Sequence, residues 1–319
     1  MLVDMPLEQL RTYTGRNERP EDLDEYWARA LAELDATPPE IEMRPSAFTA
    51  PQARCFDLYF TGVGGARIHA KLLKPRTLEG TGPAVVHFHG YTGRAGDWTE
   101  YLRWAGAGFV AAALDCRGQA GESEDPGGVR GNTVHGHIIR GLDDGPDKLL
   151  YRSIFLDTVR LARIVMNLDE VDDSRVAATG GSQGGGLTLA CASLEPRISR
   201  LAPVFPFLSD YRRVWEMDLA DRAYKELKDF FRHFDPTHER EAEYFRRLGY
   251  IDVHNLSDRI RGKTVMYTGL MDSVCPPSTQ FAAYNAISAE KEMVIYPDFG
   301  HENLPEVNDR IFQFILEMA

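Results

Sequence analysis

One serine, Ser182, lies in a setting that suits nucleophilic chemistry, within Gly180-Gly-Ser-Gln-Gly184. A short stretch typical of a buried strand precedes it at 175–179, and apolar residues recur at helical spacing over 187–194. This order of strand, tight turn and helix is typical of a nucleophile elbow, which projects the serine hydroxyl from a sheet while glycines prevent clashes. The alternative interpretation is a glycine-rich turn whose serine has no chemical role.

Ser182 would need two partners elsewhere in the chain. A serine hydroxyl is a poor nucleophile until an imidazole accepts its proton and a carboxylate holds that imidazole in one tautomer. His301 follows the last predicted strand, and Asp272 follows the predicted strand before it. The chain order Ser182, Asp272, His301 is that of α/β-hydrolases. Asp298, in the same loop as His301, is the alternative acid, and a surface-loop histidine is the alternative for His301.

Two main-chain N–H groups are candidate oxyanion donors. The first belongs to Gln183, directly after the serine, where the start of the predicted helix also directs its positive end at a developing negative charge. The second belongs to Tyr91, in the loop after a predicted strand at 84–89. Each such donor typically contributes about 10²–10³ in rate.

Other histidines occur in alternating pairs. His87 and His89 share one face of a predicted strand, but no further ligand accompanies them, and packing is the favoured role. His135 and His137 belong to a glycine-rich loop at 131–137, which we expect to shape the mouth of the site. Neither a metal nor another cofactor is predicted.

The composition bounds the class of protein. The chain has 319 residues and a formal net charge of −12, which argues against a nucleic-acid partner because phosphate binding needs clustered Lys and Arg. Its four cysteines lie far apart, without a C-x-x-C pair, and are expected to be free thiols. The sequence has neither a signal-peptide pattern nor about 18 consecutive apolar residues, so no membrane association and a cytoplasmic location are expected.

The hydrophobic pattern predicts one α/β domain over 1–319, with a doubly wound, mostly parallel sheet. An N-terminal helical extension covers 1–45, where Trp27 belongs to an apolar stripe that indicates packing. Two alternating runs at 55–60 and 67–73 then predict an antiparallel hairpin at a sheet edge. Continuous apolar strands alternate with helices after this hairpin.

One segment, 210–261, interrupts the alternation. It has no strand-like run and is rich in charged and aromatic residues, so it predicts a helical insertion. Because it follows a predicted strand at 201–205, it should lie at the end of the sheet where ligands bind. We expect it to form a cap over the site or an oligomer contact.

These motifs together resemble the acetyl xylan esterase and cephalosporin C deacetylase family, the seventh family of carbohydrate esterases. The three signature motifs of that family are matched by Arg117-Gly-Gln119, Gly180-Gly-Ser-Gln-Gly-Gly185 and His301-Glu302. Further similar segments extend from Trp27 to the final helix. One departure is Ala120, where the family pattern has glycine, and it affects local loop shape only. For Arg117 and Gln119 we expect a structural role, joining neighbouring loops.

The resemblance implies an α/β-hydrolase with Ser182, Asp272 and His301 as catalytic triad and Tyr91 and Gln183 as oxyanion donors. It also implies a cytoplasmic homo-hexamer that deacetylates short acetylated sugars, such as xylo-oligosaccharides, and related esters such as cephalosporin C. A serine peptidase or another carboxylesterase on the same fold would use the same triad order. A non-catalytic binding protein with a hydrolase fold is the remaining alternative.

Overall fold

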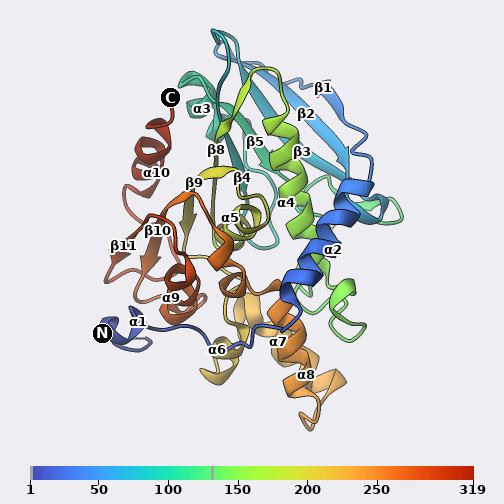
Figure 1. Ribbon diagram of the computed structural model, residues 1–319, viewed down its shortest axis with the longest axis vertical. Coiled ribbons are helices and arrows are strands. Elements are labelled where there is room, and N and C mark those ends of the chain that lie inside the picture. The colour runs from blue at the N-terminus through green and yellow to red at the C-terminus, as the bar shows by residue number, and fades with distance from the viewer. Residues whose placement is uncertain (1–2, 131–132) are drawn as a thin grey trace.

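Nine strands form one twisted sheet within residues 3–130 and 133–319, the part of the chain described by this computed structural model (Figure 1). These strands are β1 (Glu42–Pro45), β2 (Ala53–Thr61), β3 (Arg67–Pro75), β4 (Gly82–Phe88), β5 (Val110–Leu114), β8 (Val171–Gly181), β9 (Ile198–Val204), β10 (Lys263–Gly269) and β11 (Lys291–Tyr296). Their spatial order is β1-β2-β3-β5-β4-β8-β9-β10-β11. All neighbours from β5 to β11 run parallel, as the sequence predicts, while β1, β2 and β3 are antiparallel.

Helices cover both faces of this sheet. The helices are α1 (Leu7–Leu10), α2 (Leu23–Ala36), α3 (Trp98–Gly106), α4 (Leu150–Met166), α5 (Gln183–Leu194), α6 (Tyr211–Glu216), α7 (Lys225–Phe234), α8 (Glu241–Leu248), α9 (Pro277–Ala286) and α10 (Val307–Leu316). Side chains of a strand alternate between the two faces. In β4, Val86 belongs to the apolar cluster of α2, α4 and α5, whereas Val85 belongs to the cluster of α3 and α10.

The predicted hairpin is present but is not the outermost part of the sheet. Strands β2 and β3 pair in antiparallel register, with Cys55 opposite Leu73. The short strand β1 then pairs with β2 and forms the edge. These residues fall within the helical extension predicted over 1–45, since Glu-Met-Arg-Pro has little of the apolar alternation that indicates a strand. In the structure all four are exposed. The extension is therefore helical in α1 and α2 and ends in a strand.

The predicted helical insertion leaves the sheet after β9 and returns before β10. It contains α6, α7 and α8, which lie beyond the carboxyl end of the sheet in Figure 1, followed by short 3₁₀ turns at Gly249–Ile251, Val253–Asn255 and Ser257–Arg259. Aromatic side chains hold the three helices together: the ring centroids of Trp215 and Phe231 lie 4.7 Å apart, and those of Phe231 and Phe245 lie 5.8 Å apart. The insertion is thus a packed unit placed near the ends of the strands.

Buried carboxylates join the N-terminal segment to this insertion. Asp210 accepts hydrogen bonds from the Tyr13 hydroxyl at 2.7 Å and the Asn17 amide at 2.8 Å. Asp252 accepts from the Asp210 amide at 2.8 Å and contacts His254 Nδ1 at 2.6 Å. Burial disfavours the charged imidazole, but the two carboxylates outweigh it and raise the pKa of His254. These bonds satisfy polar groups that would otherwise be buried without partners.

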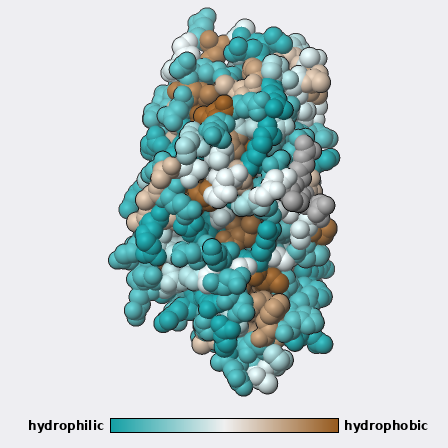
Figure 2. Space-filling model, turned by 90° about the vertical axis from the view of Figure 1, so that its right-hand side faces the viewer, coloured by the Kyte–Doolittle hydropathy of each residue, from teal (hydrophilic) through white to brown (hydrophobic). Residues whose placement is uncertain are grey.

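The surface is mostly hydrophilic, with separate apolar patches along the face shown in Figure 2. The large apolar side chains with the greatest exposure are Ile41, Met43, Val134 and Phe234. Of the helices in the described residues, none has both the length and the apolar character that a membrane crossing needs. All four cysteines are buried free thiols, which confirms the prediction.

The Trp27 side chain supplies a test of the packing of the extension. It is fully buried, stacks on Phe155 of α4 at 5.8 Å, and donates its indole N–H to the Tyr250 carbonyl at 3.0 Å. We expect Trp27→Ala to lower the free energy of unfolding by about 3–5 kcal/mol, because a large cavity forms between α2 and α4. Urea unfolding measures this value. Trp27→Phe is the control and should lose less, and a loss below about 1 kcal/mol for the alanine variant contradicts the packing role.

Candidate active site

Ser182 lies at a sharp turn between β8 and α5, as predicted. Its φ of 56° and ψ of −118° are strained for a residue with a side chain. The turn is held by hydrogen bonds from the Ser182 amide to the Val204 carbonyl and from the Phe207 amide to the Ser182 carbonyl, both 3.0 Å. The Ser182 side chain remains partly accessible while the residues that follow it are buried. The strain therefore positions the hydroxyl at the surface of the site.

The glycines beside Ser182 are required by close backbone contacts. A Cβ atom at Gly184 would lie 2.0 Å from the Phe88 carbonyl oxygen, and one at Gly180 would lie 2.5 Å from the same atom. Separations below 3 Å are not compatible with a side chain. The absence of side chains at both positions lets the start of α5 pack directly on the end of β4.

The structure brings together the three side chains that the sequence analysis selects. His301 Nε2 lies 3.0 Å from Ser182 Oγ, and His301 Nδ1 lies 2.8 Å from Asp272 Oδ2. Each residue follows the carboxyl end of a parallel strand: β8 for Ser182, β10 for Asp272 and β11 for His301. The alternative acid Asp298 is exposed on the loop, and Asp272 is the carboxylate that contacts the imidazole.

Asp272 is fully buried and held by three further donors. Its Oδ1 accepts from the amides of Val274 and Cys275, each at 2.8 Å, and Oδ2 accepts from Gln280 Nε2 at 3.3 Å. These bonds fix the plane of the carboxylate relative to the imidazole. The contribution of Gln280 is missed by the sequence analysis, which predicts no helix at α9. The sequence feature that could have indicated this role is the position of Gln280 shortly after the loop that carries Asp272.

The amides of Tyr91 and Gln183 lie on segments that pack together. Gln183 Nε2 donates to the carbonyls of His89 at 3.3 Å and Gly90 at 3.5 Å, which holds the loop after β4 against the start of α5. Neither the Tyr91 nor the Gln183 main-chain N–H has an acceptor among the described residues. Free N–H groups at the start of a helix are suited to bind negative charge.

The Arg117-Gly-Gln119 motif has the expected structural role. Arg117 makes two hydrogen bonds of 2.6 Å to Asp157 of α4 and a third of 3.0 Å to the Val63 carbonyl. Gln119 and Gln183 exchange hydrogen bonds between their side-chain amides, at 2.6 and 3.2 Å. The motif thus fixes the side chain of Gln183 through Gln119. At Ala120, the departure from the family pattern, the amide donates to the Gly93 carbonyl at 3.2 Å.

The sequence also singles out His87, His89, His135 and His137. His89 Nε2 accepts from the Cys116 amide at 3.0 Å and its Nδ1 contacts the Gly90 carbonyl, which is a structural role. Burial lowers the pKa of His87 to about 4 and that of His137 to about 4, so both are neutral near pH 7. In the predicted loop at 131–137, residues 131–132 lie outside the described part of the chain. His135 and His137 both lie beside the Tyr91 ring.

Two clusters in the described residues have the side chains that metals prefer. One consists of Asp272, Cys275 and His301, and the other of Asp210, Asp252 and His254. Hydrogen bonds within the protein already engage the carboxylates of both clusters. Burial raises the pKa of the Cys275 thiol well above its usual range, which disfavours the thiolate that a metal would need. The absence of a metal requirement stays a prediction.

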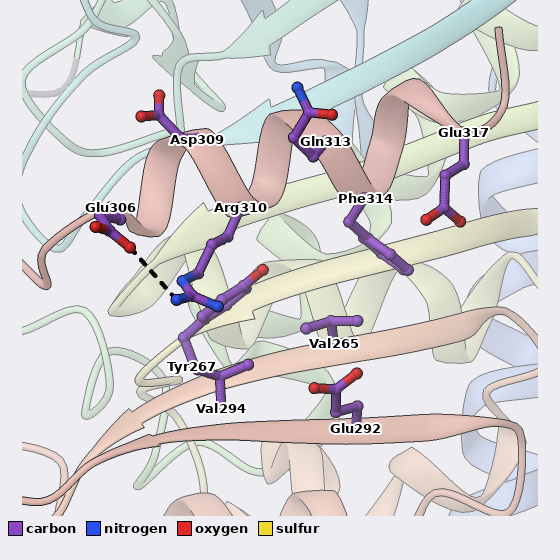
Figure 3. Close-up of a pocket in the computed structure, with 10 residues that line it drawn as sticks. All are labelled: Val265, Tyr267, Glu292, Val294, Glu306, Asp309, Arg310, Gln313, Phe314 and Glu317. Carbon is purple, nitrogen blue, oxygen red and sulfur yellow. Dashed lines mark hydrogen bonds and ion pairs between the residues drawn. The ribbon is translucent and has the colours of Figure 1, made fainter.

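A cavity of about 490 Å³ lies elsewhere, between α10 and the strands β10 and β11 (Figure 3). Its wall combines apolar side chains with the acids Glu292, Asp309 and Glu317, and Arg310 forms an ion pair of 3.3 Å with Glu306. Its lining does not include Ser182, Asp272 or His301. The reacting groups therefore do not belong to this cavity.

A serine, an aspartate and a histidine in this chain order, at the carboxyl ends of strands in a mostly parallel sheet, define the α/β-hydrolase class. A family model described as "Acetyl xylan esterase (AXE1)" matches residues 1–318. The chain belongs to the acetyl xylan esterase family and is a carboxylic ester hydrolase.

Known relatives agree with this assignment. The crystal structure of acetyl xylan esterase 1 from Thermoanaerobacterium sp. JW/SL YS485 is 58% identical and matches with a TM-score of 0.96, covering 99% of each chain. The acetyl xylan esterase from Paenibacillus sp. R4 is 37% identical, with a TM-score of 0.92 over 99% of this chain and 100% of that one. Acetyl esterase Axe7A from Xylanibacter ruminicola is 29% identical over 94% of this chain and 67% of its own length.

The strain at Ser182 predicts an unusual stability effect. Because glycine adopts a positive φ without a steric penalty, we expect Ser182→Gly to be more stable than Ser182→Ala by about 1 kcal/mol. Urea unfolding of the two variants measures this difference directly. The control is Ser193 later in α5, where glycine should be less stable than alanine by about 0.5–1 kcal/mol. Equal stability of the two Ser182 variants contradicts the strain.

Proposed function

We propose that this chain removes acetyl groups from small acetylated carbohydrates by a serine mechanism with an acyl-enzyme intermediate. The observation that carries the proposal is the continuous hydrogen-bonded line from Ser182 Oγ through His301 to Asp272, at 3.0 and 2.8 Å. These distances are within the range in which an imidazole can accept a proton from a nucleophile.

In the first step, Ser182 Oγ attacks the acetyl carbonyl carbon while His301 Nε2 takes the hydroxyl proton. The tetrahedral intermediate collapses, the bond to the sugar oxygen breaks, and His301 returns the proton to that oxygen. Water then attacks the acetyl-serine ester with His301 as base, and acetate leaves as Ser182 recovers its proton. Asp272 stabilises the imidazolium in both steps and keeps the correct tautomer.

Negative charge on the acetyl oxygen would be stabilised by the main-chain amides of Tyr91 and Gln183. Support for this role comes from the free state of both N–H groups and from the packing of their two segments. Donors that are fixed before the reaction need little rearrangement as charge develops, which is why they lower the barrier.

The substrate proposal rests on family membership. The relatives are named acetyl xylan esterases and an acetyl esterase, which supports acetylated xylo-oligosaccharides as substrates. Cephalosporin C carries an acetyl ester of the same chemistry and is proposed as a second substrate. We further propose a cytoplasmic homo-hexamer, from the resemblance alone; light scattering of the purified protein measures the subunit number.

Replacement of the nucleophile tests the serine mechanism. We expect Ser182→Ala to reduce hydrolysis of p-nitrophenyl acetate by about 10³-fold or more, because the covalent step is lost. Ser193→Ala is the matched control in the same region and should keep the full rate with unchanged folding by circular dichroism. A Ser182→Ala variant that retains most of the rate contradicts the mechanism and favours a non-catalytic role for the constellation.

Substrate assays separate the esterase from a peptidase. We expect acetate release from acetylated xylo-oligosaccharides and from cephalosporin C, and no cleavage of peptide amides. The physical reason is that resonance stabilises an amide more than an ester, so a site that cleaves an acetyl ester with this triad need not cleave a peptide bond. Acetate is quantified by a coupled assay, with Ser182→Ala as the blank. Peptide cleavage without acetate release contradicts the proposal.

A further inference from the structure

A buried acid from the helical insertion contacts the segment proposed to bind the oxyanion. Glu226 of α7 is 5% exposed, and its Oε1 accepts a hydrogen bond from the Tyr91 hydroxyl. Its Oε2 accepts from the amides of Ile138 at 2.8 Å and Ile139 at 3.2 Å. Among the described residues, no Lys or Arg forms an ion pair with Glu226. One carboxylate thus joins three segments that are distant in the sequence.

Keeping an acid in this position has an energetic cost. Burial raises the pKa of Glu226 to about 7, although the Tyr91 hydroxyl and the backbone amides act in the opposite direction. The Tyr91 hydroxyl and backbone amides contact it directly, and Tyr151 and Tyr211 lie near enough to interact with its charge. Burial and the neighbouring carboxylate also raise the pKa of Tyr91, so its hydroxyl keeps the proton that it donates. A costly buried acid without a cation is more typical of functional sites than of structural ones.

Tyr91 is restrained from several directions. Its ring centroid lies 5.3 Å from that of Phe207 and 5.3 Å from that of His137, and its hydroxyl also accepts from the His137 amide at 3.3 Å. The carbonyls that precede it, of His89 and Gly90, are held by Gln183. With the side chain fixed by Glu226 and the backbone fixed by Gln183, the orientation of the Tyr91 main-chain N–H is determined.

From these contacts we infer that Glu226 is a positioning residue for acyl transfer, which orients the Tyr91 main-chain N–H toward the oxyanion by holding the Tyr91 hydroxyl. The inference rests on the proposed serine mechanism and adds to it a role for the insertion, since α7 completes the oxyanion site. Because the oxyanion exists only in the transition state and the tetrahedral intermediate, a misdirected N–H lowers kcat and leaves KM almost unchanged.

The test uses Tyr91→Phe and Glu226→Gln in the full chain. Tyr91→Phe keeps the main-chain N–H and removes the hydroxyl, and with it the bond to Glu226 and the weaker bond of 3.3 Å from the His137 amide. Glu226→Gln keeps that hydroxyl and removes the charge. We expect each variant to lower kcat for p-nitrophenyl acetate by about 10- to 100-fold, less than complete loss of a donor. Asp229→Asn, which removes an exposed charge from the same helix, is the matched control and should keep the full rate.

Two further readouts exclude a merely structural effect. The double variant should be no slower than the slower single variant, because both changes weaken the same contact between Tyr91 and Glu226. Inhibition by a small boronic acid, whose tetrahedral adduct occupies the oxyanion site, should weaken by the same factor as kcat/KM. Folded variants with unchanged kcat, or with KM raised at unchanged kcat, overturn the inference. If Ser182→Ala also keeps its activity, the serine mechanism itself has failed; if it does not, only the role of Glu226 has failed.

The burial of Glu226 has a separate signature in stability. In the folded chain its carboxyl releases its proton at about pH 7 instead of the usual 4.5, so the folded state binds the proton more tightly. The contribution of Glu226 to the free energy of unfolding is therefore complete below about pH 4.5 and is lost as the pH rises to 7. Relative to wild type, Glu226→Gln should gain stability across this window. If the difference in the free energy of unfolding between Glu226→Gln and wild type does not change with pH, Glu226 is not a buried acid without a cationic partner.

Discussion

The close approach of α5 to the end of β4 is the contact on which the rest of the site depends. The Phe88 carbonyl occupies the space that a side chain at Gly180 or Gly184 would need. This packing brings the loop that carries Tyr91 beside Gln183, and it forces Ser182 into a strained conformation that exposes its hydroxyl. The nucleophile and the two proposed oxyanion donors are therefore consequences of one backbone contact. Asp272 and His301 follow β10 and β11, which lie beyond β9 in the same parallel part of the sheet.

Buried polar groups hold this contact in place. Arg117 and Asp157 fix the loop after β5 on α4, and the paired amides of Gln119 and Gln183 extend this support to the start of α5. Tyr151 also donates to Gln183, at 2.7 Å. Since unmade bonds in a dry interior are costly, such a network favours one arrangement of the loops over its alternatives. The insertion adds Glu226 to the same arrangement through its contact with Tyr91.

Much of this arrangement can be predicted from the sequence because it depends on local pattern and chain order. The glycines around Ser182, the apolar strands and the positions of Asp272 and His301 after those strands all leave local signals. Strand β1 does not, since its exposed residues lack apolar alternation and its pairing with β2 is a tertiary effect. Glu226 is similar: its residue type is common on helix surfaces, and only the fold shows that it faces Tyr91, 135 positions away.

A crystal structure after reaction with diethyl p-nitrophenyl phosphate tests the central claim most directly, because the adduct mimics the tetrahedral intermediate. The account predicts phosphorus bonded to Ser182 Oγ and its phosphoryl oxygen about 2.7–3.1 Å from the main-chain nitrogens of both Tyr91 and Gln183. An adduct on another residue, or a phosphoryl oxygen directed into solvent away from these nitrogens, would contradict it.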